Sequence, residues 1–108
     1  MGKRIDRRLD DVEWDDSMVL LHNGEPVTGE VVETTVDGVV LSSDQYVDGV
    51  PDGATREWWA DGRLKAEGTV RRGRLVGTYR EWHEDGEPAV QKEFDADGLL
   101  VAEQRWPR

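Results

Sequence analysis

The sequence contains no cysteine, which excludes disulfides, thiolate nucleophiles and Cys-based zinc sites. This absence fits a reducing compartment, so we expect a cytoplasmic protein. No apolar run approaches the ~20 residues that a membrane-spanning helix needs. The basic start MGKRIDRR is followed by the acidic LDDVEWDD instead of the apolar core of a signal peptide. We therefore expect neither a membrane span nor a secretory leader.

Groups for acid-base chemistry are equally scarce. The histidines are His22 and His83, and the sequence has no Gly-rich phosphate loop, HExxH helix or GxSxG elbow. The segment EFDADGLLVAEQ fits the first half of a calcium loop, but it ends in Gln104 where a bidentate Glu is required. Paired carboxylates lie in an acidic run without an apolar pocket that would raise a pKa. We predict a protein that is not an enzyme and that has no catalytic residues, cofactor or metal.

Basic residues are missing from one half of the chain. Between Leu9 and Gly53 there is no lysine or arginine, and 12 acidic residues give this stretch a net charge of −12. From Ala54 onward, 10 basic residues nearly balance 11 acidic ones. Such a field repels nucleic acid and anionic lipid and attracts basic proteins. We therefore expect no nucleic acid and no membrane among the partners; the alternative is an acidic surface that serves only solubility.

What the sequence does contain is an internal repeat of 24 residues. Trp58, Trp82 and Trp106 recur at this interval, and glycines and Asp-Gly pairs keep the same register. The units are 46–69 and 70–93, with a degenerate unit at about 22–45 and a truncated unit at 94–108. We divide the chain into an acidic N-terminal segment, 1–17, expected to be partly ordered, and a repeat domain, 18–108.

The spacing of turn signals predicts the secondary structure of each unit. Six Asp-Gly pairs and Asn23-Gly24 supply the positive φ angles of type I′ turns, and short strand-like runs lie between them. No window has a sustained helical period of 3.6 residues. The prediction is an all-β fold: a single-layer antiparallel meander of β-hairpins with one hairpin per repeat.

Alternation along a strand then assigns the two faces of the sheet. Trp58, Trp82 and Trp106 fall on one face, where we expect them to form a core ladder. Their expected packing neighbours are Leu64, Ala66, Val70, Val90 and Phe94. Trp59 falls on the opposite, polar face, and its equivalent in the next repeat is His83. An additional Trp on a polar face is a candidate contact residue, and incidental burial is the alternative.

The segments YVDGVPDGATREWWADG and VRRGRLVGTYREWHEDG resemble the MORN-variant repeat, and over about residues 18–106 the chain resembles bacterial YwqK-type antitoxins. It departs from the repeat pattern at Thr34, where a Trp belongs, at Val101, where a third Gly belongs, and in its truncated last unit. The resemblance implies an antitoxin or immunity protein that binds a toxin domain and blocks it.

The leading hypothesis is therefore neutralisation of a cognate toxin, a basic protein for which a nuclease is one candidate. An acidic surface can occupy the basic cleft of a nuclease as a phosphate mimic. The acidic residues expected to steer the toxin are Asp10, Asp11, Glu13, Asp15, Asp16, Glu30 and Glu33. The polar-face contacts expected are Trp59, Tyr79, His83, Glu57 and Glu81. The alternative is a non-enzymatic scaffold that assembles proteins or oligomerises through a sheet edge; of the oligomeric states, we favour a monomer.

Overall fold

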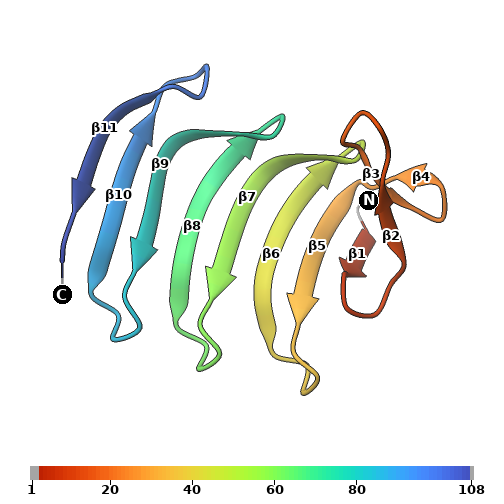
Figure 1. The fold of residues 1–108 in the computed structure, drawn as a ribbon, viewed down its shortest axis with the longest axis horizontal. Helices are drawn as coiled ribbons and strands as arrows, with labels where there is room; N and C mark the ends of the chain where they lie inside the picture. Colours follow the sequence, from red (N-terminus) through yellow and green to blue (C-terminus); the bar gives the residue numbers. More distant parts are fainter. Residues whose placement is uncertain (1–2, 108) are drawn as a thin grey trace.

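The structure, a computed structural model, describes residues 3–107; Met1 and Gly2 of the N-terminal segment and Arg108 of the last repeat unit lie outside the described residues. Every regular element between residues 3 and 107 is a β-strand, and the strands form two sheets (Figure 1). The large sheet contains, in spatial order, β1 (Lys3–Asp6), β5 (Gly29–Thr34), β6 (Val40–Val47), β7 (Val50–Trp58), β8 (Leu64–Arg71), β9 (Arg74–Trp82), β10 (Pro88–Phe94) and β11 (Leu100–Arg105). The small sheet contains β2 (Val12–Trp14), β3 (Leu20–His22) and β4 (Glu25–Pro26).

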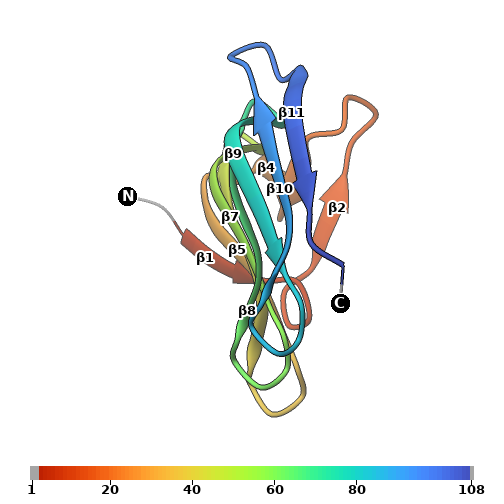
Figure 2. The same ribbon diagram turned by 90° about the vertical axis from the view of Figure 1, so that its left-hand side faces the viewer.

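The all-β prediction is confirmed, but the prediction of one antiparallel layer is incomplete. From β5 to β11 each strand pairs antiparallel with the next, whereas β1 pairs in parallel with β5. Gly29 permits this pairing, because its φ is 136° and a Cβ there would lie 2.1 Å from the carbonyl oxygen of Lys3. The small sheet adds a second layer at the N-terminal end of the large one (Figure 2).

The hydrophobic core lies between these two layers. Its members are Ile5, Leu20, Val27, Val31 and Tyr46, all at most 7% exposed. The N-terminal segment therefore contributes a core residue, and its Trp14 ring lies 6.3 Å from the Tyr46 ring. Two layers form here because the apolar side chains of β3 and of the β4–β5 connection need an apolar surface against which to pack.

The predicted core ladder is wrong. Trp58, Trp82 and Trp106 are only half-buried. Ala66 and Val90 are 5% and 8% exposed, but the strand register pairs them with the two glutamates that precede Trp58 and Trp82, on the face opposite to the predicted one. Strict alternation fails because the register shifts beside both tryptophans, between Glu57 and Trp58 and between Pro88 and Val90.

The turns repeat, although not with the predicted geometry. The N–H groups of Gly38, Gly62 and Gly86 each donate at 2.9 Å to the carbonyl three residues earlier, and in these loops only the glycine has a positive φ. This is a type I turn closed by a glycine bulge. Both central residues have positive φ, as a type I′ turn requires, at Asn23-Gly24, Asp48-Gly49 and Arg72-Gly73. Asp52-Gly53 marks no turn, because it lies inside β7.

The register also defines two faces of the large sheet. One row across β5 to β11 consists of Glu33, Ser42, Glu57, Ala66, Glu81, Val90 and Arg105. We call the face with this row the front face, and the face with Arg56, Glu67, Arg80 and Gln91 the back face. The small sheet packs on the front face beside Val31 and Tyr46, so its cover ends near β6. Nowhere between residues 3 and 107 does the structure hold a helix that could span a lipid bilayer.

Candidate functional site

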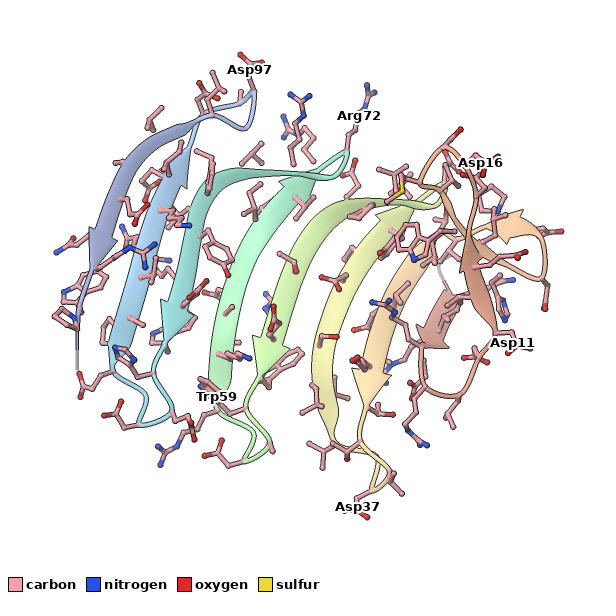
Figure 3. All side chains as sticks on the ribbon, in the orientation of Figure 1. Asp11, Asp16, Asp37, Trp59, Arg72 and Asp97 are labelled. Carbon is pink, nitrogen blue, oxygen red and sulfur yellow. The ribbon has the colours of Figure 1, made fainter. Side chains whose placement is uncertain are left out.

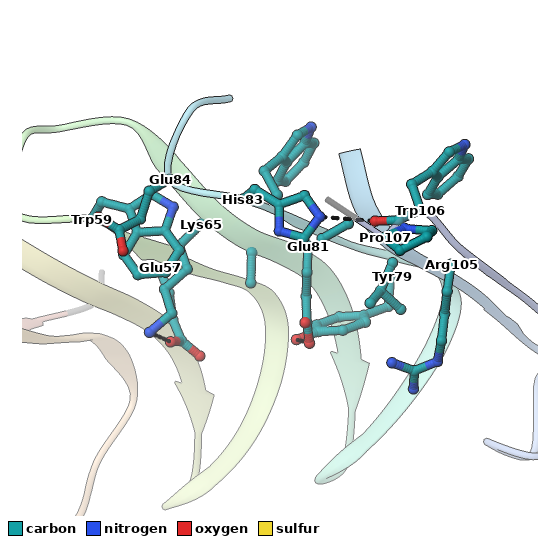
Figure 4. A pocket seen from close by; sticks show the side chains of 14 residues that line it. Glu57, Trp59, Lys65, Tyr79, Glu81, His83, Glu84, Arg105, Trp106 and Pro107 are labelled. Carbon is teal, nitrogen blue, oxygen red and sulfur yellow. Dashed lines mark hydrogen bonds and ion pairs between the residues drawn. The ribbon is translucent and has the colours of Figure 1, made fainter. Parts of the chain in front are cut away.

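The open part of the front face contains a groove of about 690 Å³ (Figure 4). Its lining residues include the five predicted polar-face contacts, Glu57, Trp59, Tyr79, Glu81 and His83. The structure thus brings these five side chains together around one hollow. The remaining lining residues are Lys65, Ala66, Trp82, Glu84, Ala89, Val90, Arg105, Trp106 and Pro107.

The groove exists because small side chains alternate with long ones along the front row. Ala66 and Val90 lie between the glutamates and the arginine of that row and form the floor. Glu57 and Glu81 are two strands apart, which is about 10 Å. A sheet with these small residues at every second strand leaves a channel about one side chain wide between its carboxylates.

Trp59 forms one end of the groove, and the ammonium group of Lys65 lies over its ring. The Lys65 ammonium lies 4.7 Å from the Trp59 ring centroid and 3.9 Å from the Glu57 carboxylate (Figure 4). The Trp59 indole Nε1 is shielded from solvent and has no hydrogen-bond partner among the described residues. This end therefore combines an aromatic face and a carboxylate, which together bind cations, with an unused N–H donor.

Tyr79 and Glu81 form the middle of the groove. The Tyr79 hydroxyl donates to the Glu81 carboxylate at 2.7 Å. Burial raises the pKa of Tyr79 well above its ordinary value, and the hydrogen bond to Glu81 and the charges of Glu81 and Glu57 add to this rise. The phenol therefore stays protonated and orients the carboxylate, which presents its remaining acceptor sites to the groove.

His83 closes the groove on the side of the C-terminal strand. Its Nε2 lies 2.8 Å from the carbonyl oxygen of Trp106, so Nε2 carries the proton and donates it in a hydrogen bond (Figure 4). This bond ties the loop after β9 to the residue after β11. His83 is predicted as a contact residue, and only its other ring nitrogen is left for such a contact, because Nε2 is already bonded within the chain.

The predicted acidic residues do not share one surface. Glu33 is exposed on the front row with Glu57 and Glu81, whereas Glu30 lies on the back face, 3.4 Å from Arg4. Asp15 and Asp16 lie in the loop between β2 and β3, and Figure 3 shows Asp16 at the far end of the strands from Trp59.

The carboxylate of Asp15 is used within its own loop, where it accepts the N–H groups of Ser17 and Val19. Asp10 likewise accepts the N–H of Asp6 at 2.9 Å, whereas Asp11 and Glu13 are exposed. The predicted acidic residues therefore do not form one continuous surface with Trp59.

Sequence reasoning missed Lys65, Arg105 and Trp106 as groove residues. The signal for Arg105 is the strand register, which pairs it with Val90 of the front row. Lys65 lies between Leu64 and Ala66 at the register shift of β8, and no local pattern in the sequence marks that shift. Alternation along the strands predicts Trp106 in the core ladder, but Trp106 lines the groove instead.

Aromatic rings and carboxylates of the kind that line the groove can bind positively charged groups, and Lys65 and Arg105 line it as well. Within residues 3–107 no three acidic or histidine side chains converge as a metal-binding set. In the segment that partly fits a calcium loop, the Asp95 carboxylate accepts the N–H groups of Asp97 and Leu99, and it thereby stabilises the turn between β10 and β11.

Comparison with known proteins leaves the family open. No family model matches the sequence, and no curated protein matches it. A solved structure described as the GtfA/B complex bound to UDP and GlcNAc is similar with a TM-score of 0.41 and 10% identity. The match covers 90% of this chain and 20% of that one, so this chain spans about a fifth of that protein.

Proposed function

We propose that this protein is a cytoplasmic immunity protein or antitoxin that binds a cognate basic toxin domain through the groove of its front face. The sheet is, in this proposal, a meander of hairpins built from MORN-type repeats, and the protein acts by occlusion and not as an enzyme. The observation that carries the proposal is the pairing of aromatic rings with carboxylates in an open groove that no other part of the described chain covers.

The periodic placement of acid on the front face supports this reading. Glu33, Glu57 and Glu81 stand in one row at every second strand, about 10 Å apart. A basic protein surface with cationic side chains at similar intervals is the complement of such a row.

The contact between Lys65 and Trp59 supports the choice of a cationic partner. The Lys65 ammonium lies over the indole, 4.7 Å from its centroid, and this contact supports a cationic group as the ligand of the ring and Glu57. A lysine or arginine of the toxin would use the same interactions along the groove, and Glu81 would accept its hydrogen bonds.

Assembly of other proteins is a second candidate function. It is favoured by the outer side of β11, which no strand within residues 3–107 covers, since an open strand edge binds further strands. A monomer in light scattering, together with rescue of cells from one specific toxin, would argue against a scaffold.

The direct test is titration calorimetry with the product of the adjacent gene at low salt, with rescue of growth on co-expression. Trp59→Phe removes the unused N–H and keeps a ring, whereas Glu81→Gln removes one charge. Each should weaken binding by about tenfold or more if its group is a main contact. The matched control is Glu67→Gln, a half-buried glutamate on the neighbouring strand but on the back face.

Two results would count against the proposal. One is the absence of any binding or rescue by the native chain. The other is an equal loss of affinity in Glu81→Gln and Glu67→Gln, because that would place the contact elsewhere than in the groove.

A further inference from the structure

The two edges of the large sheet differ in how well they are protected. The edge strand β1 has four residues, of which Lys3, Arg4 and Asp6 are charged, and such short, charged edges resist further pairing. The edge strand β11 has six residues, all exposed, with neither lysine nor proline. Leu99, Leu100 and Val101 beside or within it are 63%, 50% and 64% exposed. No strand among the described residues pairs with the outer side of β11.

The backbone of β11 presents a defined set of groups on that outer side. The N–H of Trp106 donates to the carbonyl oxygen of Ala89 at 2.9 Å, so Trp106 faces β10. Because successive residues of an antiparallel strand face opposite neighbours, Gln104 also faces β10. Glu103 and Arg105 therefore direct their N–H and C=O groups outward, away from the sheet.

The side chains of these two residues make the edge complementary to itself. Glu103 and Arg105 share one face of β11 and form an ion pair. In an antiparallel pair of two such strands with the two-fold axis at Gln104, each Glu103 lies opposite the other copy's Arg105. A register centred on Glu103 instead would place two glutamates opposite each other, which is unfavourable.

The charge distribution along the sheet favours the same contact. The stretch with a net charge of −12 runs from Leu9 to Gly53 and builds the small sheet, β5, β6 and the start of β7. The terminal strand β11 lies at the other end of the molecule, whose longest dimension is 43 Å (Figure 1). Two copies that meet at β11 keep their acidic ends much farther apart than the screening length of about 8 Å at physiological salt.

We propose that β11 is a dimerisation edge that binds β11 of a second copy of this chain, antiparallel and centred on Gln104. The two eight-stranded sheets then form one continuous sheet. The two-fold axis of an antiparallel pair is perpendicular to the sheet, so both grooves open on the same side. The sequence alone favours a monomer, and the unprotected edge is the reason to expect a dimer. The inference does not depend on the proposed function.

Sedimentation velocity over a range of protein concentrations tests this contact. The native chain should show a monomer–dimer equilibrium. Glu103→Arg and Arg105→Glu each place like charges opposite one another at two positions, and each should weaken dimerisation by about tenfold. The double variant, Glu103→Arg with Arg105→Glu, restores opposite charges and should restore the dimer.

The control is Arg4→Glu at the other edge, which should leave dimerisation unchanged. All three positions are exposed or half-exposed, so circular dichroism should report a native sheet in each of the four variants. The proposal is overturned by a native chain that stays monomeric at all concentrations. It is equally overturned by single reversals that leave the dimer intact, by a double variant that fails to recover it, or by an effect of Arg4→Glu as large as theirs.

Discussion

Trp59 is packed within the chain and still keeps an unused hydrogen-bond donor. Its ring holds the Lys65 ammonium, while its Nε1 has neither solvent nor a partner among residues 3–107. A buried donor without an acceptor costs about 1–3 kcal/mol, and a bound partner would recover that cost if its binding moved the groups that shield Nε1. At the equivalent position of the next repeat, His83 already donates to Trp106. The two repeats therefore differ in what they leave available for binding.

Tyr79 gives a pH dependence whose sign follows from its surroundings. Burial, with the nearby Glu81, raises its pKa above the ordinary 10.0, and burial also raises the pKa of Tyr46. The unfolded chain then releases these protons at lower pH than the folded chain does. The unfolding free energy contributed by both tyrosines should be fully present below the ordinary pKa of 10.0 and should fall as the pH rises above it. Urea unfolding at increasing pH measures this fall.

The control for this prediction is Tyr79→Phe, which should show a shallower fall with pH than the native chain. The ultraviolet absorbance of tyrosinate provides an independent readout. Tyrosinate formation at the ordinary pKa, with a native circular dichroism spectrum, would contradict the assigned environment of Tyr79.

Among the elements, the turn between β6 and β7 has two roles. It reverses the chain, with Asp48 and Gly49 both at positive φ, and it also provides the surface on which the small sheet docks. The N–H of Leu20 donates to the carbonyl oxygen of Gly49 at 2.8 Å, and the N–H of Gly49 donates to Val27 at 2.7 Å. The same kind of turn at Arg72-Gly73 supports no second layer, because nothing lies within 4 Å of Gly73 where a Cβ would be.

Replacement of these two glycines by alanine separates the roles. Both have a φ of +83°, so each alanine carries the same backbone penalty of about 1–2 kcal/mol. At Gly49 the new Cβ would also lie 2.3 Å from a Val19 methyl and 2.8 Å from the Leu20 carbonyl oxygen. Gly49→Ala should therefore cost about 1–3 kcal/mol more than Gly73→Ala in urea unfolding. Equal losses would show that the small sheet does not depend on this contact.

At the scale of the whole molecule, most of the acidic residues of the N-terminal half lie away from the residues that line the groove. The acidic end consists of the small sheet and the first antiparallel strands, whereas the groove lies over β7 to β11, where charges nearly balance. Charges outside a contact mainly change the rate of association, whereas buried contacts mainly change the rate of dissociation.

This separation predicts different kinetics for two kinds of variant in binding to the proposed toxin. Asp11→Asn with Asp16→Asn should slow association and make it less sensitive to salt, with little effect on dissociation. Trp59→Phe should speed dissociation. Stopped-flow measurements at several salt concentrations distinguish the two effects. Faster dissociation in the acidic variant would mean that these residues are contacts rather than steering groups.

Much of the large sheet could be predicted from the sequence, because each repeat specifies its own turns and strands. Gly38, Gly62 and Gly86 close the same kind of loop at intervals of 24 residues. The side-by-side placement of Trp59 and His83 with Glu57 and Glu81 follows from the same period. The register shifts beside Trp58 and Trp82 could not be predicted, since they depend on cross-strand geometry and not on local pattern.

The N-terminal region shows the other limit of the sequence pattern. Ile5 lies in a short charged segment, yet it is 2% exposed, because β1 returns to pair with β5 beside Gly29. This contact joins residues 26 positions apart and has no counterpart in the repeat. Local periodicity carries no information about such a contact.

Because the hydrophobic core lies at one end of the large sheet, the stability of its strands decreases from that end toward β11. Strands β7 to β11 contact chiefly their sheet neighbours, whereas β5 and β6 are also held by a second layer. In a linear array of strands with a second layer at one end only, the strands farthest from that layer unfold first. The groove and the edge at β11 lie on the strands that unfold first, so a partner bound there would also raise the free energy of this local unfolding.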